Sequence, residues 1–297
     1  MKITNHHGLP SVVVQALTQD DYSKGKSNRS VTQLIDSPRV GVLYKEHEHE
    51  VEKDVVDFLW SRFGTGMHNV FEDAVESNEC LITEERLYVE AMDWTISGAI
   101  DLQELTPQGR IISDYKVTSV WSVINGKTAW EDQLNAYAWL IRKSTGDAVK
   151  QLRIICIIRD WQRRRAYEDS TYPQAPIQII LIPLWSSRDQ DKYMDNRISV
   201  HQEAQYNQLT GAPLPFCSNE ERWKKGDMYA VMKKGRKRAI RVLKSDQDAQ
   251  DYIHAISVDR DKHFVEERLG EPTRCIQNWC GVSAWCDQYQ GDMTNEG

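Results

Sequence analysis

Two apolar segments separated by a short turn constrain the fold more than any other feature of this sequence. Trp94–Leu102 and Arg110–Val117 are rich in apolar and β-branched residues, as β-strands are, and Pro107 and Gly109 mark a turn between them. Strands joined by so short a connection often pair in one sheet. The chain is therefore expected to fold around a β-sheet that contains both segments.

Charged residues interrupt both predicted strands. Asp101 lies near the end of the first, while Asp114 and Lys116 lie two positions apart in the second, so their side chains project from the same face. If the strands pair, Asp101 can point into the same pocket. Mg²⁺ and Mn²⁺ take carboxylate ligands, with water and substrate phosphate completing the shell. The pattern predicts a site that hydrolyses phosphodiester bonds with water activated by a metal ion.

The role of Lys116 follows from the charges around it. An unperturbed lysine has a pKa near ~10.4, and neighbouring carboxylates raise it further, so Lys116 is a poor general base at neutral pH. We expect Lys116 to stay charged, to position the attacking group and to stabilise the transition state.

A histidine upstream of these strands adds a further candidate ligand. His68 follows Glu52–Arg62, a segment patterned as a helix. Imidazole suits Mn²⁺ better than Mg²⁺, and Glu72, four residues later on the same helical face, could orient the ring. Taken alone, a helix histidine is more often packed or solvated than bound to metal.

The helix predicted over Trp130–Lys143 places Gln133 and Tyr137 on one face, so Tyr137 could simply belong to the core. The preceding Gly126–Thr128 segment resembles the end of a phosphate-binding loop. That loop needs glycine where Trp121 stands, which excludes a P-loop ATPase.

In their order and spacing, the candidate residues resemble the RecB-type branch of the PD-(D/E)XK nucleases, which includes the RecB and AddAB nuclease domains and the exonucleases of CRISPR adaptation. The resemblance is carried by His68, Asp101, Asp114-Tyr115-Lys116, Gln133 and Tyr137. It implies a restriction-endonuclease-like core and a metal held by His68, Asp101, Asp114 and the Tyr115 backbone carbonyl. It also implies a catalytic set of Asp101, Asp114, Lys116, Gln133 and Tyr137, in which the last two orient the site and contact DNA.

Three cysteines form a second constellation: Cys275, Cys280 and Cys286, in a C-x4-C-x5-C run. Six cysteines without a signal peptide indicate a reducing compartment, here the cytoplasm, or the cytoplasm of a bacterial host if the protein is phage-encoded. Clustered thiols in such a compartment bind metal more often than they form disulfides.

A four-thiolate site needs one more cysteine. Cys217 follows a proline-containing loop and is the favoured ligand, Cys80 is the alternative, and Cys156 in a buried strand is most simply an inert core residue. Zinc and iron–sulfur clusters both accept four thiolates. One distant cysteine with a C-terminal triplet is similar to the site of several RecB-type nucleases, which implies a structural [4Fe–4S] cluster, with Zn²⁺ as the alternative. In those relatives the lone cysteine usually precedes the first catalytic motif, whereas Cys217 follows the last.

The chain has a net charge of −7, so contact with DNA requires a local basic surface. Such a surface occurs in a predicted hairpin around Gly235, at Lys233, Lys234, Arg236, Lys237 and Arg238. A basic hairpin tip can grip phosphates without reading sequence. A merely solvated surface hairpin has the same pattern.

Strands mixed with helices indicate an α/β fold with a mixed central β-sheet flanked by helices and a C-terminal cysteine-cluster appendage. No apolar run approaches the roughly 18 residues of a transmembrane helix, so no membrane contact is expected. The predicted regions are a lead-in segment at 1–40, a nuclease core at 41–210, and the basic hairpin with the cysteine cluster at 211–297. Further predicted elements are strands at 151–161 and 176–185, a polar loop at 162–174, and helices at 186–209 and 246–257.

Together these patterns predict a metal-dependent DNA nuclease, with an exonuclease of phage or repair and recombination DNA processing preferred. Its expected partner is DNA, as single strands or ends, beside a single-strand annealing protein. The alternatives are a structure-selective endonuclease or nickase with the same site, and a DNA-binding module that retains the fold without turnover.

Overall fold

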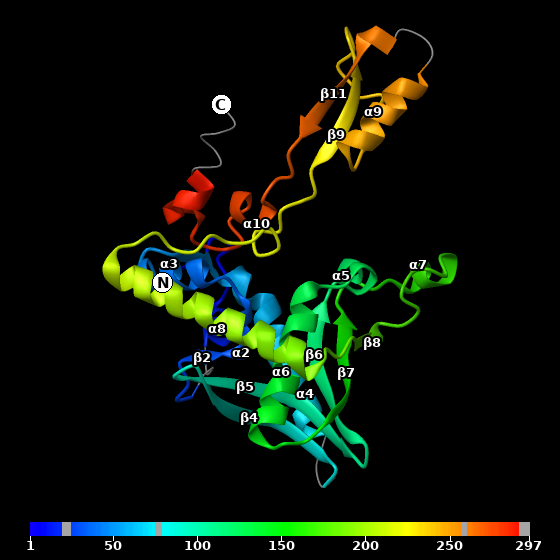
Figure 1. The fold of residues 1–297 in the computed structure, drawn as a ribbon. Coiled ribbons are helices and arrows are strands. Elements are labelled where there is room, and N and C mark those ends of the chain that lie inside the picture. Colours follow the sequence, from blue (N-terminus) through cyan, green and yellow to red (C-terminus); the bar gives the residue numbers. More distant parts are fainter. Residues whose placement is uncertain (20–24, 75–78, 257–259, 291–297) are drawn as a thin grey trace. The chain divides into compact units, whose positions relative to one another are not determined.

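The computed structural model describes residues 1–19, 25–74, 79–256 and 260–290. The chain divides into two compact units, Met1–Pro215 and Phe216–Gly297 (Figure 1). The first unit contains the strands and helices of the predicted catalytic site. The second contains the basic hairpin and the cysteine triplet.

A six-stranded mixed sheet organises the first unit. β5 pairs antiparallel with β6, β6 parallel with β7, and β7 antiparallel with β8, while β4 and the short β2 also pair with β5. The predicted α/β architecture with a central mixed sheet flanked by helices is confirmed. The strands are β2 (Arg29–Ser30), β4 (Leu81–Ala91), β5 (Trp94–Thr106), β6 (Gly109–Thr118), β7 (Val149–Ile158) and β8 (Ile177–Ile182).

Helices cover both faces of this sheet. α6 (Thr128–Ser144) packs on one face, where its side chains join those of the sheet in the main hydrophobic core. α4 (Leu59–Asp73) packs against β6 from the opposite face, because its Phe71 ring stacks on Tyr115 while the adjacent Asp114 meets α6. Side chains alternate along β6, so Asp114 faces α6 and Tyr115 faces α4.

The long helix α8 (Ser187–Thr210) packs against α6 and is capped by Ser186, whose side chain accepts a hydrogen bond from the Asp189 N–H. In the described ranges, no helix combines the length and the apolar character that a membrane span requires. Shorter elements complete the first unit: β1 (Lys2–Thr4), α1 (Ser11–Thr18), α2 (Val31–Ile35), α3 (Pro38–Glu46), β3 (Glu52–Asp54), the 3₁₀ turn η1 (Val55–Phe58), α5 (Val120–Asn125) and α7 (Arg163–Glu168).

The first 40 residues contribute directly to the core. Ser30 and Gln33 form a capping box at the start of α2, which satisfies backbone groups at the helix end. Val31 and Leu34 on this helix are fully buried in the main core. The segment predicted as a lead-in thus supplies a strand of the sheet and a helix packed on it.

A buried cation ties the start of α3 to the last residues of the first unit. Arg39 is only 1% exposed. Its Nε donates a hydrogen bond to the Pro215 carbonyl at 3.0 Å, and its Nη2 donates to the Leu214 carbonyl at 2.6 Å. These bonds hold the segment before the second unit against the core.

Two local predictions need correction. The segment predicted as a helix over Glu52–Arg62 begins as strand β3, and Asp54 then caps a 3₁₀ turn in a capping box with Asp57, so α4 starts only at Leu59. The segment predicted as a polar loop at 162–174 contains the short helix α7. In the first case the capping box outweighed the hydrophobic spacing.

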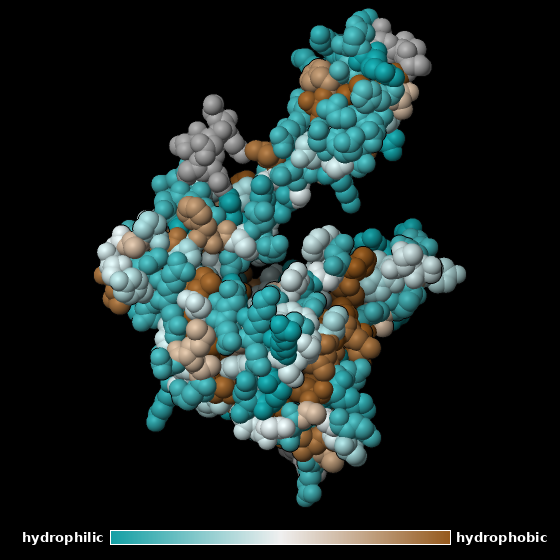
Figure 2. Space-filling model, in the orientation of Figure 1, coloured by the Kyte–Doolittle hydropathy of each residue, from teal (hydrophilic) through white to brown (hydrophobic). Residues whose placement is uncertain are grey.

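The edge strand β8 leaves an apolar face open to solvent. Ile177, Ile179 and Leu181 alternate along it and are 51%, 60% and 62% exposed. Hydrophobic residues gather over this region of the first unit in Figure 2. The other face of the same strand packs Ile180 and Ile182 against the core.

The second unit contains a three-stranded antiparallel sheet with β9 between β10 and β11. β9 and β10 form the predicted hairpin, whereas β11 was not predicted. The helix predicted over 246–257 ends at Ala255, and Ser257 lies outside the described residues. The elements are β9 (Met228–Lys233), β10 (Arg241–Leu243), α9 (Asp246–Ala255), η2 (Arg260–Lys262), β11 (His263–Arg268), α10 (Thr273–Ile276) and η3 (Ser283–Trp285).

Candidate active site

Three side chains from three elements converge in the first unit. His68 comes from α4, Glu84 from β4 and Asp101 from β5, and they offer ligand atoms that lie within 4.8 Å of one another. His68 Nδ1 is 3.4 Å from Glu84 Oε1, and His68 Nε2 is 3.6 Å from Asp101 Oδ2. One imidazole and two carboxylates therefore share a small space.

The β4–β5 hairpin brings the two carboxylates together. Met92 and Asp93 form its two-residue turn, and both have positive φ, at 49° and 62°, as a type I′ turn requires. The resulting register pairs Thr83 with Leu102 and Glu85 with Ile100, which leaves Glu84 across from Asp101.

Glu84 itself adopts a backbone conformation that side chains rarely take. Its φ is 48°, in the left-handed region, although it lies inside a strand. Such outliers persist where the surrounding structure fixes them, often at functional sites. Here the conformation accompanies the approach of the Glu84 carboxylate to His68.

The backbone of Tyr115 joins the same group. Its N–H donates a hydrogen bond to Asp101 Oδ2 at 2.8 Å, and its carbonyl oxygen lies 3.3 Å from His68 Nε2. The Tyr115 ring stacks on Phe71 with centroids 4.5 Å apart, which fixes α4 over β6. The predicted Tyr115 carbonyl and two predicted side chains, His68 and Asp101, thus lie in contact.

A second set of polar residues borders this group from the α6 side. Asp114 is 1% exposed, and its Oδ2 lies 2.7 Å from Lys116 Nζ. Gln133 Nε2 donates to Asp114 Oδ1 at 2.9 Å and lies 2.9 Å from the Tyr137 hydroxyl. Among the described residues, Asp114 Oδ2 accepts no hydrogen bond of good geometry. Its close partner is the ammonium group of Lys116.

Gly98 allows α6 to approach the sheet at this point. A Cβ atom there would lie 2.7 Å from Leu140 Cδ1 and 2.8 Å from Tyr137 Cε1. Only the bare backbone of glycine leaves room for both side chains. Gly98 therefore sets how close Tyr137 and its partner Gln133 come to Asp114.

Burial and charge shift the ionisation of these groups. Burial and the charge of Asp114 raise the pKa of Asp101 to about 7, against the opposing charges of His68 and Lys116. Burial lowers the pKa of His68, but the hydrogen bond to Glu84 and the charges of Asp101, Glu84 and Asp114 raise it to about 8. In Lys116 the carboxylates likewise outweigh burial and raise the pKa, which agrees with the predicted charged lysine.

This donor set fits a hard divalent cation. Carboxylate oxygens, a backbone carbonyl and one imidazole are ligands that Mn²⁺ and Mg²⁺ accept. Asp101 is buried, and among the described residues the buried Asp114 Oδ2 accepts no hydrogen bond and has Lys116 Nζ at 2.7 Å. Asp114, although predicted as a ligand, is not one of the three converging residues and instead contacts Lys116.

Glu84 takes the place expected for Glu72. Glu72 follows His68 on α4, but the carboxylate that contacts His68 Nδ1 belongs to Glu84. The signal that could have identified Glu84 is the hairpin register, since a turn at Met92 and Asp93 places it across from Asp101.

The predicted DNA-binding cations lie in the second unit. Lys233 ends β9, and the other four lie in the connection between β9 and β10, where Gly235 has a φ of 85°. Lys233 is partly buried, and the exposed members are Lys234, Arg236, Lys237 and Arg238.

The four predicted cluster cysteines also lie in the second unit, on two segments that are hydrogen-bonded to each other. The Cys217 backbone exchanges two hydrogen bonds with the Gln288 side chain, close to Cys286. Burial raises the pKa of the Cys275 thiol, a hydrogen bond from Arg222 lowers it, and nearby Cys280 and Cys286 raise it further.

The remaining two cysteines belong to the first unit. Cys80 is exposed, and Cys156 is fully buried, as predicted for a core residue. Burial and the charge of Asp114 raise the pKa of the Cys156 thiol to about 11, which keeps it protonated.

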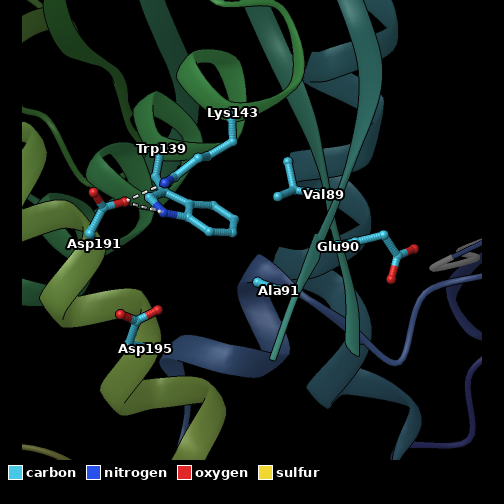
Figure 3. Close-up of a pocket in the computed structure, with 7 residues that line it drawn as sticks. All are labelled: Val89, Glu90, Ala91, Trp139, Lys143, Asp191 and Asp195. Atoms are coloured by element: carbon cyan, nitrogen blue, oxygen red, sulfur yellow. Dashed lines mark hydrogen bonds and ion pairs between the residues drawn. The ribbon is translucent and has the colours of Figure 1, made fainter. Parts of the chain in front are cut away.

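A separate hollow of about 290 Å³ lies where α6 and α8 meet the end of β4 (Figure 3). Asp191 accepts a hydrogen bond from Trp139 Nε1 and pairs with Lys143 there, while Asp195 and Glu90 add acidic groups. None of the residues that line this hollow is a predicted site residue.

No family model and no characterised protein sequence matches this chain. Several solved structures are similar to part of it, and two of them are described here. One is the crystal structure of SSO0001. The match covers 67% of this chain and 87% of SSO0001, with 15% sequence identity and a TM-score of 0.40. The other is a protein from Eubacterium rectale that is provisionally named an exonuclease. The match covers 68% of this chain and 73% of that protein, with 13% sequence identity and a TM-score of 0.28. The function of this chain has to be inferred from the site itself.

Proposed function

We propose that this protein is a metal-dependent nuclease that hydrolyses phosphodiester bonds in DNA. The observation that carries the proposal is the convergence of His68, Glu84 and Asp101 next to the Asp114–Lys116 ion pair. The first group suits Mg²⁺ or Mn²⁺, and the adjoining lysine suits a phosphate. The resemblance of the motifs to RecB-type PD-(D/E)XK nucleases supports the same activity on a restriction-endonuclease-like core.

Each residue of the candidate site has a part in the proposed mechanism. His68, Asp101 and the Tyr115 carbonyl would hold the divalent ion, with Glu84 and Asp114 as adjoining carboxylates. When bound, the ion lowers the pKa of water and neutralises charge on the phosphate. The charged Lys116 is positioned to donate to a phosphate oxygen and to stabilise the charge that develops there in the transition state.

Gln133 and Tyr137 act through Asp114. Gln133 Nε2 donates to Asp114 Oδ1 and also to the Tyr137 hydroxyl, so the other Asp114 oxygen stays directed at Lys116. Buried polar networks of this kind fix a catalytic group in one orientation. The two residues would thus orient the site, with DNA contact as their second proposed role.

Cleavage from DNA ends, as an exonuclease of phage or repair DNA processing beside a single-strand annealing protein, is the preferred form of this activity. The motif resemblance supports this form. An endonuclease or nickase would use the same residues, and its signature is cleavage of covalently closed circles.

The test is cleavage of end-labelled linear and closed circular DNA with Mn²⁺, using wild type and Asp114→Asn. We expect cleavage of linear DNA that falls by at least ~10²-fold in the variant, because Asp114 loses the charge that pairs with Lys116. Asp147→Asn is the matched control, since Asp147 pairs with Arg110 at 2.6 Å on the surface. Binding of DNA without metal-dependent cleavage would contradict a nuclease and favour a non-catalytic DNA-binding module.

For the second unit, we propose that Cys217, Cys275, Cys280 and Cys286 hold a structural [4Fe–4S] cluster, with Zn²⁺ as the alternative. The hydrogen bonds between the two cysteine-bearing segments support one shared site. Metal analysis of protein purified without oxygen distinguishes iron from zinc. If Cys280→Ala retains the metal and the full stability of the second unit, the structural role is wrong.

A further inference from the structure

Two cations lie beside the candidate site without a carboxylate partner. Lys127 directly precedes α6, Arg159 directly follows β7, and both side chains are exposed. Within the described ranges, no ion pair joins either residue to an acidic group. Unpaired cations are common on protein surfaces. A role for Lys127 and Arg159 in substrate binding therefore has to be argued from their positions relative to the candidate site.

Strand topology places both cations at one edge of the sheet. β6 and β7 run parallel, so their carboxyl ends meet, and the Arg159 N–H donates to the Thr118 carbonyl at 2.9 Å. The chain after β6 is held to the same edge, because the Val120 N–H donates to Asp160 Oδ1 at 2.7 Å. Carboxyl ends of neighbouring parallel strands are where open α/β sheets commonly bind ligands.

The cations also lie close to the catalytic lysine. Burial lowers the pKa of Lys127, and the positive charges of Arg159 and Lys116 lower it further. Three positive charges in one region repel one another, and an anion among them removes that repulsion. Next to residues proposed to act on one phosphate, the anion that fits is a neighbouring phosphate of the same strand.

An exposed aromatic pair adjoins these cations. The Arg159 guanidinium lies 4.7 Å from the centre of the Trp60 ring, and Trp60 meets Phe63 edge-on with centroids 6.3 Å apart. Trp60 and Phe63 remain 48% and 46% exposed. Aromatic faces next to basic groups are the usual platform on which unpaired bases stack.

The distance from this platform to the site suits a polynucleotide. Trp60 and His68 lie on the same helix, and their separation of eight positions corresponds to about 12 Å along its axis. A stacked strand rises 3.4 Å per nucleotide, so about three nucleotides would span that length.

We propose that Lys127, Arg159 and Trp60 form a subsite for an unpaired nucleic-acid strand. The two cations hold phosphates that lie between the cleaved position and Trp60, and Trp60 stacks on a base. The subsite rests on the proposed nuclease function and narrows its substrate to single strands or unpaired ends. Bases within a duplex are stacked on one another and cannot present a face to Trp60 without being unstacked.

The test is steady-state cleavage by the full-length protein with Mn²⁺, on an end-labelled single strand and a blunt duplex of the same sequence. On the single strand, Lys127→Gln and Arg159→Gln should each raise KM about 10-fold with kcat nearly unchanged. Each should also lower the slope of log affinity against log salt by ~0.7, the value for one lost phosphate contact. Trp60→Ala should raise KM on the single strand alone.

Control variants separate a binding role from a general effect. Lys150→Gln removes an exposed cation near the opposite end of β7 and should leave KM and the salt slope unchanged. Arg159→Lys keeps the charge and should restore the salt slope. Trp60→Phe keeps a smaller aromatic ring and should give an intermediate KM, and it tests the stacking role even if Trp60→Ala fails to fold.

The remaining outcomes are distinct. Wild-type KM and salt slope in the Lys127, Arg159 and Trp60 variants would overturn the subsite while the nuclease function stands. Equal rises in KM on single strand and duplex would overturn the preference for unpaired strands. If the wild type neither binds nor cleaves DNA with Mn²⁺, the proposed function fails and the subsite fails with it.

Discussion

Lys116 in the first unit and Lys234 in the second are both expected to meet phosphate, yet their surroundings differ. Lys116 is 29% exposed and paired with a carboxylate that is itself fixed by Gln133. Lys234 is exposed beside the glycine of a hairpin connection.

The difference indicates a division of labour. Groups held in a buried network are already oriented and act in a medium of low dielectric, where each interaction counts strongly. Exposed cations attract a polyanion from a distance, and salt screens them. We therefore propose that the first unit carries out the chemistry and that the second unit captures the substrate.

The largest expected effect comes from changing one lysine in each unit. Lys116→Gln should lower kcat by about 10²–10³-fold, because it removes a charged donor aimed at the developing phosphate charge. Lys234→Gln should leave kcat nearly unchanged. Parallel kinetics on linear DNA with Mn²⁺ measures both, and equal effects on kcat would remove the proposed distinction between the units.

The next effect concerns the carboxylate that sequence patterns did not identify. Glu84→Gln should weaken Mn²⁺ binding by about 10–100-fold, the usual range for residues that orient a metal ligand. Calorimetric titration with Mn²⁺ measures this, with Glu72→Gln, four residues after His68 on α4, as the control. A larger loss in the Glu72 variant would restore the original assignment.

Mn²⁺ affinity should also depend on pH. A metal requires neutral imidazole and ionised carboxylates. With pKa values of about 8 for His68 and about 7 for Asp101, both groups take up protons as the pH falls from 8.5 to 6. Binding should weaken over this window by up to ~10-fold per pH unit for each proton displaced. Affinity that stays constant across the window would show that neither group is a ligand.

Two glycines allow the same comparison at the level of stability. Gly98→Ala should destabilise the first unit by about 1–3 kcal/mol, because its Cβ would enter the space of Leu140 and Tyr137. Gly235→Ala meets no neighbour within 4 Å, and its cost of about 1–2 kcal/mol arises from its left-handed backbone. Thermal unfolding measures both changes. Only Gly98→Ala should also lower kcat, since it displaces the residues that hold Asp114.

The smallest expected effect lies in the hairpin charges. Lys237→Gln and Arg238→Gln should each reduce DNA affinity only a few-fold and lower the salt slope by ~0.7, as single exposed phosphate contacts do. Binding isotherms at several salt concentrations test this. A loss as large as that of a buried site variant would show that the second unit does more than capture.

Much of the first unit follows from local sequence patterns. The alternation that places Asp114 and Lys116 on one face operates within three residues, and the spacing of Gln133 and Tyr137 within one helical turn. Such short-range periodicities depend only on the local secondary structure and not on how distant segments pack. The strands of the sheet and the helix α6 could be predicted for the same reason.

Glu84 could not be predicted in this way. Its position depends on the register of a hairpin whose turn residues, Met92 and Asp93, lack the glycine that usually marks such turns. The first 40 residues pose a similar difficulty, because a two-residue strand has no period to detect and becomes visible only by pairing with β5. Strand β11 was missed because half of its residues are charged, as suits an exposed edge.

Arg39 determines where the polypeptide can be divided. A fragment that stops at residue 210, the end of the predicted core, lacks the Leu214 and Pro215 carbonyls that accept from its guanidinium. Each acceptor lost by a buried donor costs about 1–3 kcal/mol. A fragment that continues through Pro215 keeps both. The limit of an independently folding first unit is therefore set by one buried side chain 176 residues upstream of the cut.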